Sequence, residues 1–404
     1  MNFQVDAFGT IVIAVFVLFI GRFLLQHISF LRNYNIPEPV AGGLVAALVA
    51  FILFYYFQLS ASFDPQIQSV LMLMFFTSIG LSASLSKLKK GGKALFTFLI
   101  CVALYVLVQN FVGMSLATLL GLDPLIGLIV GSITLTGGHG TAGAWGTVLE
   151  QEYAIQGAVV LGMASATFGL IIGGIVGGPV AKFLIKRHQL AKIQTEHDTH
   201  LPQHDVAAFE YSKQTRLITA SDAITTLGLF AGCIFSANFL AQWSAGQWFE
   251  LPTFVWALGS GVMVRNVIEM LFKQEIFDRA IDVFGNASLS LYLAMALLSL
   301  QLWLLADLAG ALLIILLVQT VVLILYTIFV TFNVMGKDYD AAVLAAGHCG
   351  FGMGATPTAI ANIQAVTNRY GTSHKAFLII PLCGAFFVDI INAVVIQTIL
   401  RIFS

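Results

Sequence analysis

Long apolar runs with almost no charged residues recur along most of this 404-residue chain. A run of 18 or more apolar residues is long enough to cross the hydrocarbon core of a bilayer as an α-helix. Charged residues make up only 10% of the chain, whereas a typical soluble domain has about 25%. The sequence therefore predicts an all-α polytopic membrane protein.

Ten of these runs have the length of a spanning helix. We expect spanning helices near 7–26, 40–57, 67–86, 94–120, 155–182, 217–242, 252–270, 283–305, 309–334 and 376–402. The first run has no basic segment before it, which favours a spanning helix over a cleaved signal peptide. Two further apolar segments, 124–148 and 341–366, are rich in Gly, Ser and Thr and need a separate argument.

The distribution of positive charge decides whether these two segments cross the membrane. Short cytoplasmic loops carry the excess of Lys and Arg. If the N-terminus is outside and both segments enter and leave on the same side, 18 of the 19 Lys and Arg residues are cytoplasmic, all except Arg401. If both segments crossed, eight would be inside and eleven outside. We therefore expect ten crossings and two re-entrant segments, with both termini periplasmic.

A polar stretch, 186–216, separates two sets of five predicted spans. It has few apolar residues and no helical period, so we interpret it as one long cytoplasmic loop. The chain then divides into an N-terminal half, 1–185, and a C-terminal half, 217–404.

Three short matches relate the two halves at nearly one offset along the chain. IPEPV at 36–40 matches LPTFV at 251–255. The Phe-Asp pair at 63–64 recurs at 277–278, and Gly138 matches Gly354. Because each half has an odd number of crossings, the second half must be inverted relative to the first. Inverted repeats with broken segments near the midplane are typical of secondary transporters.

The two re-entrant segments contain the motifs GSITLTGGHGTAGAW (131–145) and GHCGFGMGATPTAIAN (347–362). Non-helical backbone at membrane depth is tolerated only where it is buried in protein or lines a cavity. A short helix that begins at such a turn presents free N–H groups, which bind a carboxylate without a lysine. The candidate substrate-binding residues are Gly137, Gly138, His139, Gly140, Thr141, Gly352, Gly354, Ala355, Thr356 and Thr358. The alternative is that these small residues only allow close helix packing.

Asp389 is the one acidic residue deep within a predicted span. Such a residue usually marks an ion or substrate pathway. Its carboxylate could bind Na⁺, a hard cation that prefers oxygen ligands, or a substrate amino group; the alternative is a neutral, hydrogen-bonded acid. The candidate Na⁺ ligands are Thr134, Thr136, Ser288, Ser290, Asn362 and Asp389. The Ser and Thr hydroxyls could instead bond to their own helices.

His139 and His348 lie within the Gly-rich segments. Histidine can relay protons near neutral pH. We interpret both as hydrogen-bonded structural residues, with a proton relay as the alternative.

Four stretches carry a family resemblance that extends over nearly the whole chain: IPEPVAGG, LDPLIGLIVGSITLTGGHGTAGAW, GNASLSLYLAMAL and DAAVLAAGHCGFGMGATPTAIANIQAVT. The chain resembles the glutamate:sodium symporter family. The resemblance implies Na⁺-coupled uptake of L-glutamate across the bacterial inner membrane, with Na⁺ as coupling ion and no further cofactor. It also implies a homodimer in which a transport domain slides against a scaffold. Substrate and Na⁺ sites are implied at the tips, 137–141 and 352–358.

Other functions remain as alternatives at this point. A symporter for another small carboxylate would use the same N–H groups, and a channel could also have inverted repeats. An intramembrane hydrolase needs a single nucleophile–base pair, but the chain has two repeat-related motifs and no G-x-S-x-G elbow. There is no basic stripe for nucleic acid. We expect a transporter and not an enzyme.

Overall fold

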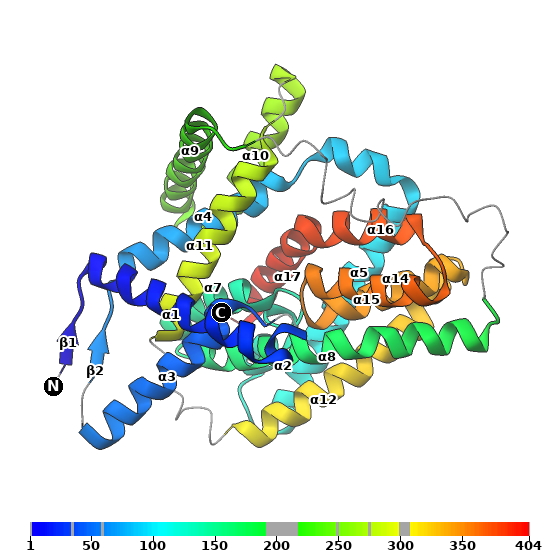
Figure 1. The fold of residues 1–404 in the computed structure, drawn as a ribbon, viewed down its shortest axis with the longest axis horizontal. Coiled ribbons are helices and arrows are strands. Elements are labelled where there is room, and N and C mark those ends of the chain that lie inside the picture. Colours follow the sequence, from blue (N-terminus) through cyan, green and yellow to red (C-terminus); the bar gives the residue numbers. More distant parts are fainter. Residues whose placement is uncertain are drawn as a thin grey trace.

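The computed structural model describes residues 2–33, 36–57, 60–190, 217–247, 250–273, 276–298 and 308–403. Most of the predicted central loop, from residue 191 to 216, lies outside the described residues. So does the end of the predicted span 283–305. Nearly all the described residues are helical (Figure 1). The expectation of an all-α polytopic protein is confirmed.

The helices of the N-terminal half begin at Ala7. They are α1 (Ala7–His27), α2 (Ser29–Asn33), α3 (Glu38–Phe57), α4 (Pro65–Ser82), α5 (Leu85–Leu119), α6 (Pro124–Leu128), the π-helix η1 (Ile129–Ile133), α7 (Gly138–Glu152) and α8 (Ala158–Arg187). Two short strands, β1 (Asn2–Gln4) and β2 (Ser60–Ser62), pair in parallel. The strand pair joins the N-terminus to the connection between α3 and α4.

The C-terminal half repeats this order of helices. It contains α9 (Ala220–Ser244), α10 (Thr253–Val267), η3 (Ile268–Phe272), α11 (Asp278–Leu298), α12 (Ala309–Tyr326), η5 (Thr327–Thr331), α13 (Phe332–Val334), α14 (Tyr339–Met353), α15 (Thr356–Tyr370), α16 (His374–Leu382), η6 (Cys383–Phe387) and α17 (Val388–Phe403). The starts of α3, α4 and α6 correspond to those of α10, α11 and α14 at a nearly constant sequence offset. This offset agrees with that of the sequence matches, although the inverted relation of the halves stays a prediction.

Within the described residues, nine helical segments are long and apolar enough to cross a membrane. The tenth predicted span, 376–402, corresponds to α16, η6 and α17, which follow one another without a gap. Pro381 lies inside this segment, two residues before the π-turn. Because proline has no N–H, the helical hydrogen bond to the carbonyl of Phe377, one turn earlier, is missing.

Aspartates define where several of these helices begin. Asp64 caps α4, and Asp123 and Asp338 cap α6 and α14, each through a hydrogen bond that its side chain accepts from a backbone N–H. Such a cap contributes about 1 kcal/mol to helix stability. Asp123 and Asp338 occupy equivalent positions in the two halves, so the two Gly-rich segments start with the same local structure.

The helices form two groups that lie side by side in Figure 1. Group A contains α1, α3, α4, α9, α10 and α11, and group B contains α5–α8 and α12–α17. Group A is held together in part by Arg265, a 2% exposed side chain on α10. Its guanidinium pairs with Glu269 and Asp278 and donates to the carbonyl of Leu81. Group B contains both Gly-rich segments.

Candidate functional site

The first Gly-rich segment interrupts its helix at two places. Gly131 departs from helical geometry within η1 (φ −96°, ψ −131°), and α7 starts again at Gly138, which has a φ of +70°. A positive φ is accessible to glycine at little cost because it has no Cβ. The first residue of α7 therefore has to be one that tolerates a left-handed backbone.

The second Gly-rich segment is a break between two helices. Residue Gly354 follows α14 with a φ of −139° and a ψ of −110°, and Ala355 is extended before α15 begins at Thr356. Neither α7 nor α15 has a side-chain cap at its N-terminus. A helix without such a cap has N–H groups that can bind an anion, and the helix dipole adds to that attraction.

The two breaks meet. A Cβ built on Gly138 would lie 3.7 Å from the carbonyl oxygen of Gly354. Both glycines line a cavity of about 680 Å³ at the border between group A and group B. We call residues 137–141 the first tip and residues 352–358 the second tip. The two tips at which the family resemblance implies substrate and Na⁺ sites therefore lie next to each other.

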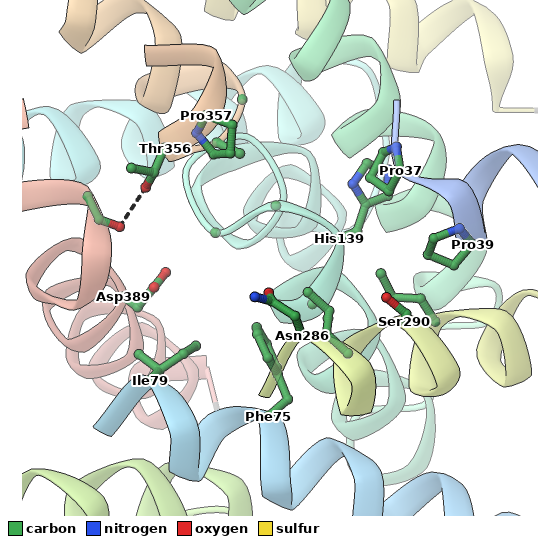
Figure 2. Close-up of a pocket in the computed structure, with 18 of the residues that line it drawn as sticks. Pro37, Pro39, Phe75, Ile79, His139, Asn286, Ser290, Thr356, Pro357 and Asp389 are labelled. Atoms are coloured by element: carbon green, nitrogen blue, oxygen red, sulfur yellow. Dashed lines mark hydrogen bonds between the residues drawn. The ribbon is translucent and has the colours of Figure 1, made fainter. Parts of the chain in front are cut away.

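The cavity has walls from both helix groups. Figure 2 shows Phe75, Ile79 and Asn286 of group A opposite Thr356 and Asp389 of group B. Its lining residues are Pro37, Glu38, Pro39, Phe75, Ser78, Ile79, Ser82, Gly137, Gly138, His139, Gly140, Leu170, Asp282, Asn286, Leu289, Ser290, Leu293, Gly354, Ala355, Thr356, Pro357, Thr358, Gly384 and Asp389. Three of them carry carboxylates, and none is Lys or Arg. An anionic ligand would thus have to be held by backbone N–H groups, hydroxyls and the side-chain amide of Asn286.

Ten of the predicted site residues line this cavity. They are Gly137, Gly138, His139, Gly140, Ser290, Gly354, Ala355, Thr356, Thr358 and Asp389. The Thr356 hydroxyl donates a 2.7 Å hydrogen bond to the carbonyl of Gly384, drawn as a dashed line in Figure 2. This bond ties the start of α15 to the π-turn η6, close to Asp389 in the sequence.

Six predicted site residues do not line the cavity: Thr134, Thr136, Thr141, Ser288, Gly352 and Asn362. The Ser288 hydroxyl donates to the carbonyl of Phe284 on its own helix, at 2.7 Å. Asn362 donates to the carbonyl of Gly173 on α8, at 2.8 Å. The amide of Asn362 therefore fastens α15 to α8.

Asp389 projects into the cavity in Figure 2, from the first turn of α17. Its side chain is partly buried, and no hydrogen bond or ion pair links it to another described residue. The alternative of an acid hydrogen-bonded inside the helix bundle thus has no support among the described contacts. A carboxylate in this position is available to bind a cation or an ammonium group.

Both histidines of the Gly-rich segments are hydrogen-bonded, as expected. A ring nitrogen of His139 lies 3.0 Å from the hydroxyl of Thr167, and Nδ1 of His348 lies 2.9 Å from that of Thr331. His348 is fully buried, and its ring packs edge-on against Phe98 and Tyr105. Each imidazole therefore has a structural partner within group B.

Several buried side-chain oxygens near the tips have no hydrogen-bond partner among the described residues. They are Oγ of Ser132, Oγ1 of Thr134, Oγ1 of Thr358 and Oδ1 of Asn392. The amide of Asn392 donates to the carbonyl of Ser132, at 2.8 Å, and the N–H of Ser132 donates to Oδ1 of Asn110, at 2.9 Å. Unpartnered buried oxygens are unusual in a folded protein, and oxygen is the ligand that a hard cation requires.

Three polar residues of this region, Gln109, Asn110 and Ser132, were not among the predicted site residues. Gln109 and Asn110 are adjacent polar residues inside the predicted span 94–120. Polar residues at such positions usually face the bundle interior and often serve function. That signal was present in the sequence, but it could not show that both amides reach the first Gly-rich segment.

Comparison with known proteins agrees with this architecture. The family model described as sodium/glutamate symporter matches residues 3–372. The chain is 49% identical over 400 residues to the sodium/glutamate symporter of Escherichia coli (strain K12), covering 99% of this chain and 98% of that protein. It is 47% identical over 398 residues to the one of Haemophilus influenzae (strain ATCC 51907 / DSM 11121 / KW20 / Rd), covering 98% of each. The chain belongs to the sodium/glutamate symporter family, whose members are transporters and not enzymes.

Proposed function

We propose that this protein imports L-glutamate across the bacterial inner membrane together with Na⁺. The observation that supports this most directly is the cavity in which the two Gly-rich tips meet. Its relatives are named for the same activity. No cofactor beyond the coupling ion is part of the proposal.

The tips supply donors for the carboxylates of the substrate. The uncapped starts of α7 and α15 provide N–H groups, and Thr358 provides a hydroxyl that has no hydrogen-bond partner among the described residues. A cavity of about 680 Å³ lies within the range of small-molecule sites. Asp389 then has two roles open to it, as partner of the α-ammonium group or as a Na⁺ ligand.

The unpartnered oxygens near the tips supply candidate Na⁺ ligands. Thr134 was a predicted ligand, and the neighbouring Ser132 and Asn392 extend the set. A cation there would relieve the cost of leaving buried oxygens unpaired, about 1–3 kcal/mol for each group. Na⁺ bound in this place would also stabilise the irregular backbone that carries the first tip. Binding of substrate and binding of cation would then favour each other.

The mechanism that fits is an elevator, in which group B slides against group A. Both tips belong to group B, and the cavity lies at the border of the groups. A rigid displacement of group B would carry the tips and Asp389 together towards the other face of the membrane. Rigid-body movement of one bundle against the other is common in transporters built from inverted repeats.

We also propose a homodimer, with the central loop in the cytoplasm and both termini in the periplasm. The family resemblance implies the dimer, and the charge distribution supports the topology. Cross-linking in native membranes tests the oligomeric state.

The strongest second candidate is a symporter for another small carboxylate. Backbone N–H groups bind any carboxylate, so the tips alone do not distinguish the two substrates. The carboxylate of Asp389 favours a substrate with an ammonium group. A di- or tricarboxylate without one would instead bring negative charge towards Asp389, Asp282 and Glu38.

Uptake of radiolabelled L-glutamate into proteoliposomes tests the proposal. With an inward Na⁺ gradient, we expect accumulation above equilibrium that unlabelled L-glutamate competes. Replacement of Na⁺ by K⁺ should abolish it. A channel would give no accumulation above equilibrium. Folded protein without Na⁺-dependent accumulation would contradict the proposal and require other anions and proton coupling to be examined.

A further inference from the structure

We propose that Gln109 of α5 is a positioning residue that couples the two tips, so that cation binding and substrate binding strengthen each other through its side-chain amide. This inference rests on the proposed function and adds a residue that touches neither ligand.

The amide of Gln109 contacts both Gly-rich segments. The hydroxyl of Thr136, one residue before the first tip, donates to Oε1 of Gln109 at 2.6 Å. Nε2 of Gln109 donates to the carbonyl of Gly352, in the second tip, at 2.9 Å. Thr136 belongs to the N-terminal half of the chain and Gly352 to the C-terminal half. One side chain therefore joins two segments that come from different halves.

The amide itself is held in place from several sides. Gln109 and Gln319 are both fully buried. Nε2 of Gln319 on α12 donates to the backbone carbonyl of Gln109 at 2.7 Å, and Nε2 of Gln109 also reaches the hydroxyl of Tyr105 at 3.2 Å. The bond from Gln319 holds the backbone of α5 against α12, whereas the side-chain amide of Gln109 itself contacts the two Gly-rich segments and can transmit a displacement of one tip to the other.

The residues that Gln109 contacts are adjacent to those that line the cavity. Thr136 precedes Gly137, and Gly352 lies two residues before Gly354. A ligand that draws the first tip inward moves Thr136, and the hydrogen bonds through Gln109 then favour a matching position of Gly352. Because the coupling free energy is reciprocal, a ligand at either tip raises the affinity at the other.

A purely structural role makes a different prediction. A buried amide with a purely structural role contributes to the stability of the fold and not to the coupling of the two ligands. Its replacement by an apolar side chain of similar shape then changes the thermal stability and leaves the coupling unchanged. Gln319 offers a matched control, because it is an equally buried amide. Its Nε2 donates to the backbone of Gln109, and its side chain reaches neither tip in the described hydrogen bonds.

The test measures binding of radiolabelled L-glutamate to purified protein at low and at saturating Na⁺. The readout is the ratio of the two dissociation constants. Wild type should show a large ratio. Gln109→Met should reduce that ratio by up to about 30-fold, because both hydrogen bonds that join the two segments are lost. Gln319→Met should leave the ratio near that of wild type even where it lowers thermal stability.

Each outcome has a defined meaning. A wild-type ratio in folded Gln109→Met protein would overturn the coupling role, as would an equal fall in Gln319→Met. If Gln109→Met does not fold, Thr136→Val is the second variant, because it removes only the bond between Thr136 and Gln109. An unchanged ratio of dissociation constants in Thr136→Val would then overturn the proposal. Failure of the proposed function is distinguishable, because wild type itself would then show no Na⁺-dependent glutamate binding.

Discussion

The guanidinium of Arg401 donates a 2.8 Å hydrogen bond to the backbone carbonyl of Glu250. The amide of Gln397 donates to the same carbonyl at 3.1 Å. These bonds join the end of α17, in group B, to the connection between α9 and α10, in group A. Arg401 is also the one basic residue that the predicted topology places outside. The two helix groups are thus fastened together at the expected periplasmic side.

These two bonds hold the groups together at the expected periplasmic side. Their removal should favour the state in which the cavity opens to the periplasm. Each hydrogen bond contributes about 0.5–1.5 kcal/mol, so the double change Arg401→Ala with Gln397→Ala should shift the balance of the two states by about 5- to 150-fold. We would introduce Asn286→Cys, a cavity-lining position, after replacing the four native cysteines. Labelling by an impermeant thiol reagent from outside should then become faster.

Thr398→Ala is the matched control for that experiment, because among the described residues its hydroxyl bonds only to the carbonyl of Val394 on the same helix. Equal labelling rates in the double variant and in the Thr398 control would show that the bonds to Glu250 do not keep the periplasmic side of the cavity closed.

Replacement of Asp389 by asparagine should impair transport without preventing folding. The carboxylate projects into the cavity, and an amide of the same shape removes only its charge (Figure 2). A charge-assisted contact contributes about 1.5–3 kcal/mol, so the apparent affinity for glutamate or Na⁺ should fall about 10- to 100-fold. Asp64→Asn is the control, because asparagine also caps a helix and Asp64 lies outside the cavity.

The measurement separates the two roles of Asp389. Loss of apparent Na⁺ affinity at saturating glutamate would indicate a cation ligand, and loss of glutamate affinity at saturating Na⁺ would indicate an ammonium partner. Wild-type kinetics in Asp389→Asn would argue against both.

Two glycines of α8 should respond in opposite ways to alanine. A Cβ on Gly169 would lie 2.0 Å from the carbonyl oxygen of Met353, at the end of α14, whereas a Cβ on Gly178 meets nothing within 4 Å. Gly169→Ala should therefore lower the free energy of unfolding by about 1–3 kcal/mol. Gly178→Ala should be neutral or stabilise by up to about 1 kcal/mol through helix propensity.

Thermal unfolding in detergent compares the two variants directly. Equal midpoints for Gly169→Ala and Gly178→Ala would mean that α8 and α14 do not approach each other as closely as the structure shows.

The predicted topology has a test of its own in the central loop. Gln194→Cys, introduced into a cysteine-free background, should resist impermeant thiol reagents in intact cells and react after the membrane is permeabilised. A cysteine at Asn2, at the expected periplasmic N-terminus, should show the reverse behaviour. Labelling of Gln194→Cys in intact cells would overturn both the orientation and the re-entrant interpretation.

The sequence by itself determined the membrane class, the helices and the family. Apolar runs of about 20 residues have one stable form in a bilayer, because every backbone polar group must be paired within the segment. The Gly-rich motifs were sufficient to locate both tips, since a break in the helix requires residues such as Gly138. Asp389 was recognisable because a lone acid in an apolar run has few structural uses.

Only the tertiary structure decided which polar groups are free and which are already paired. The structure shows that Ser288 and Asn362 donate hydrogen bonds to the carbonyls of Phe284 and Gly173, whereas their role as cation ligands stays a prediction. Gln109 gave no sign in the sequence of joining Thr136 to Gly352. Such pairings depend on how helices far apart in the sequence pack against each other, and the local pattern of apolar residues carries no information about that.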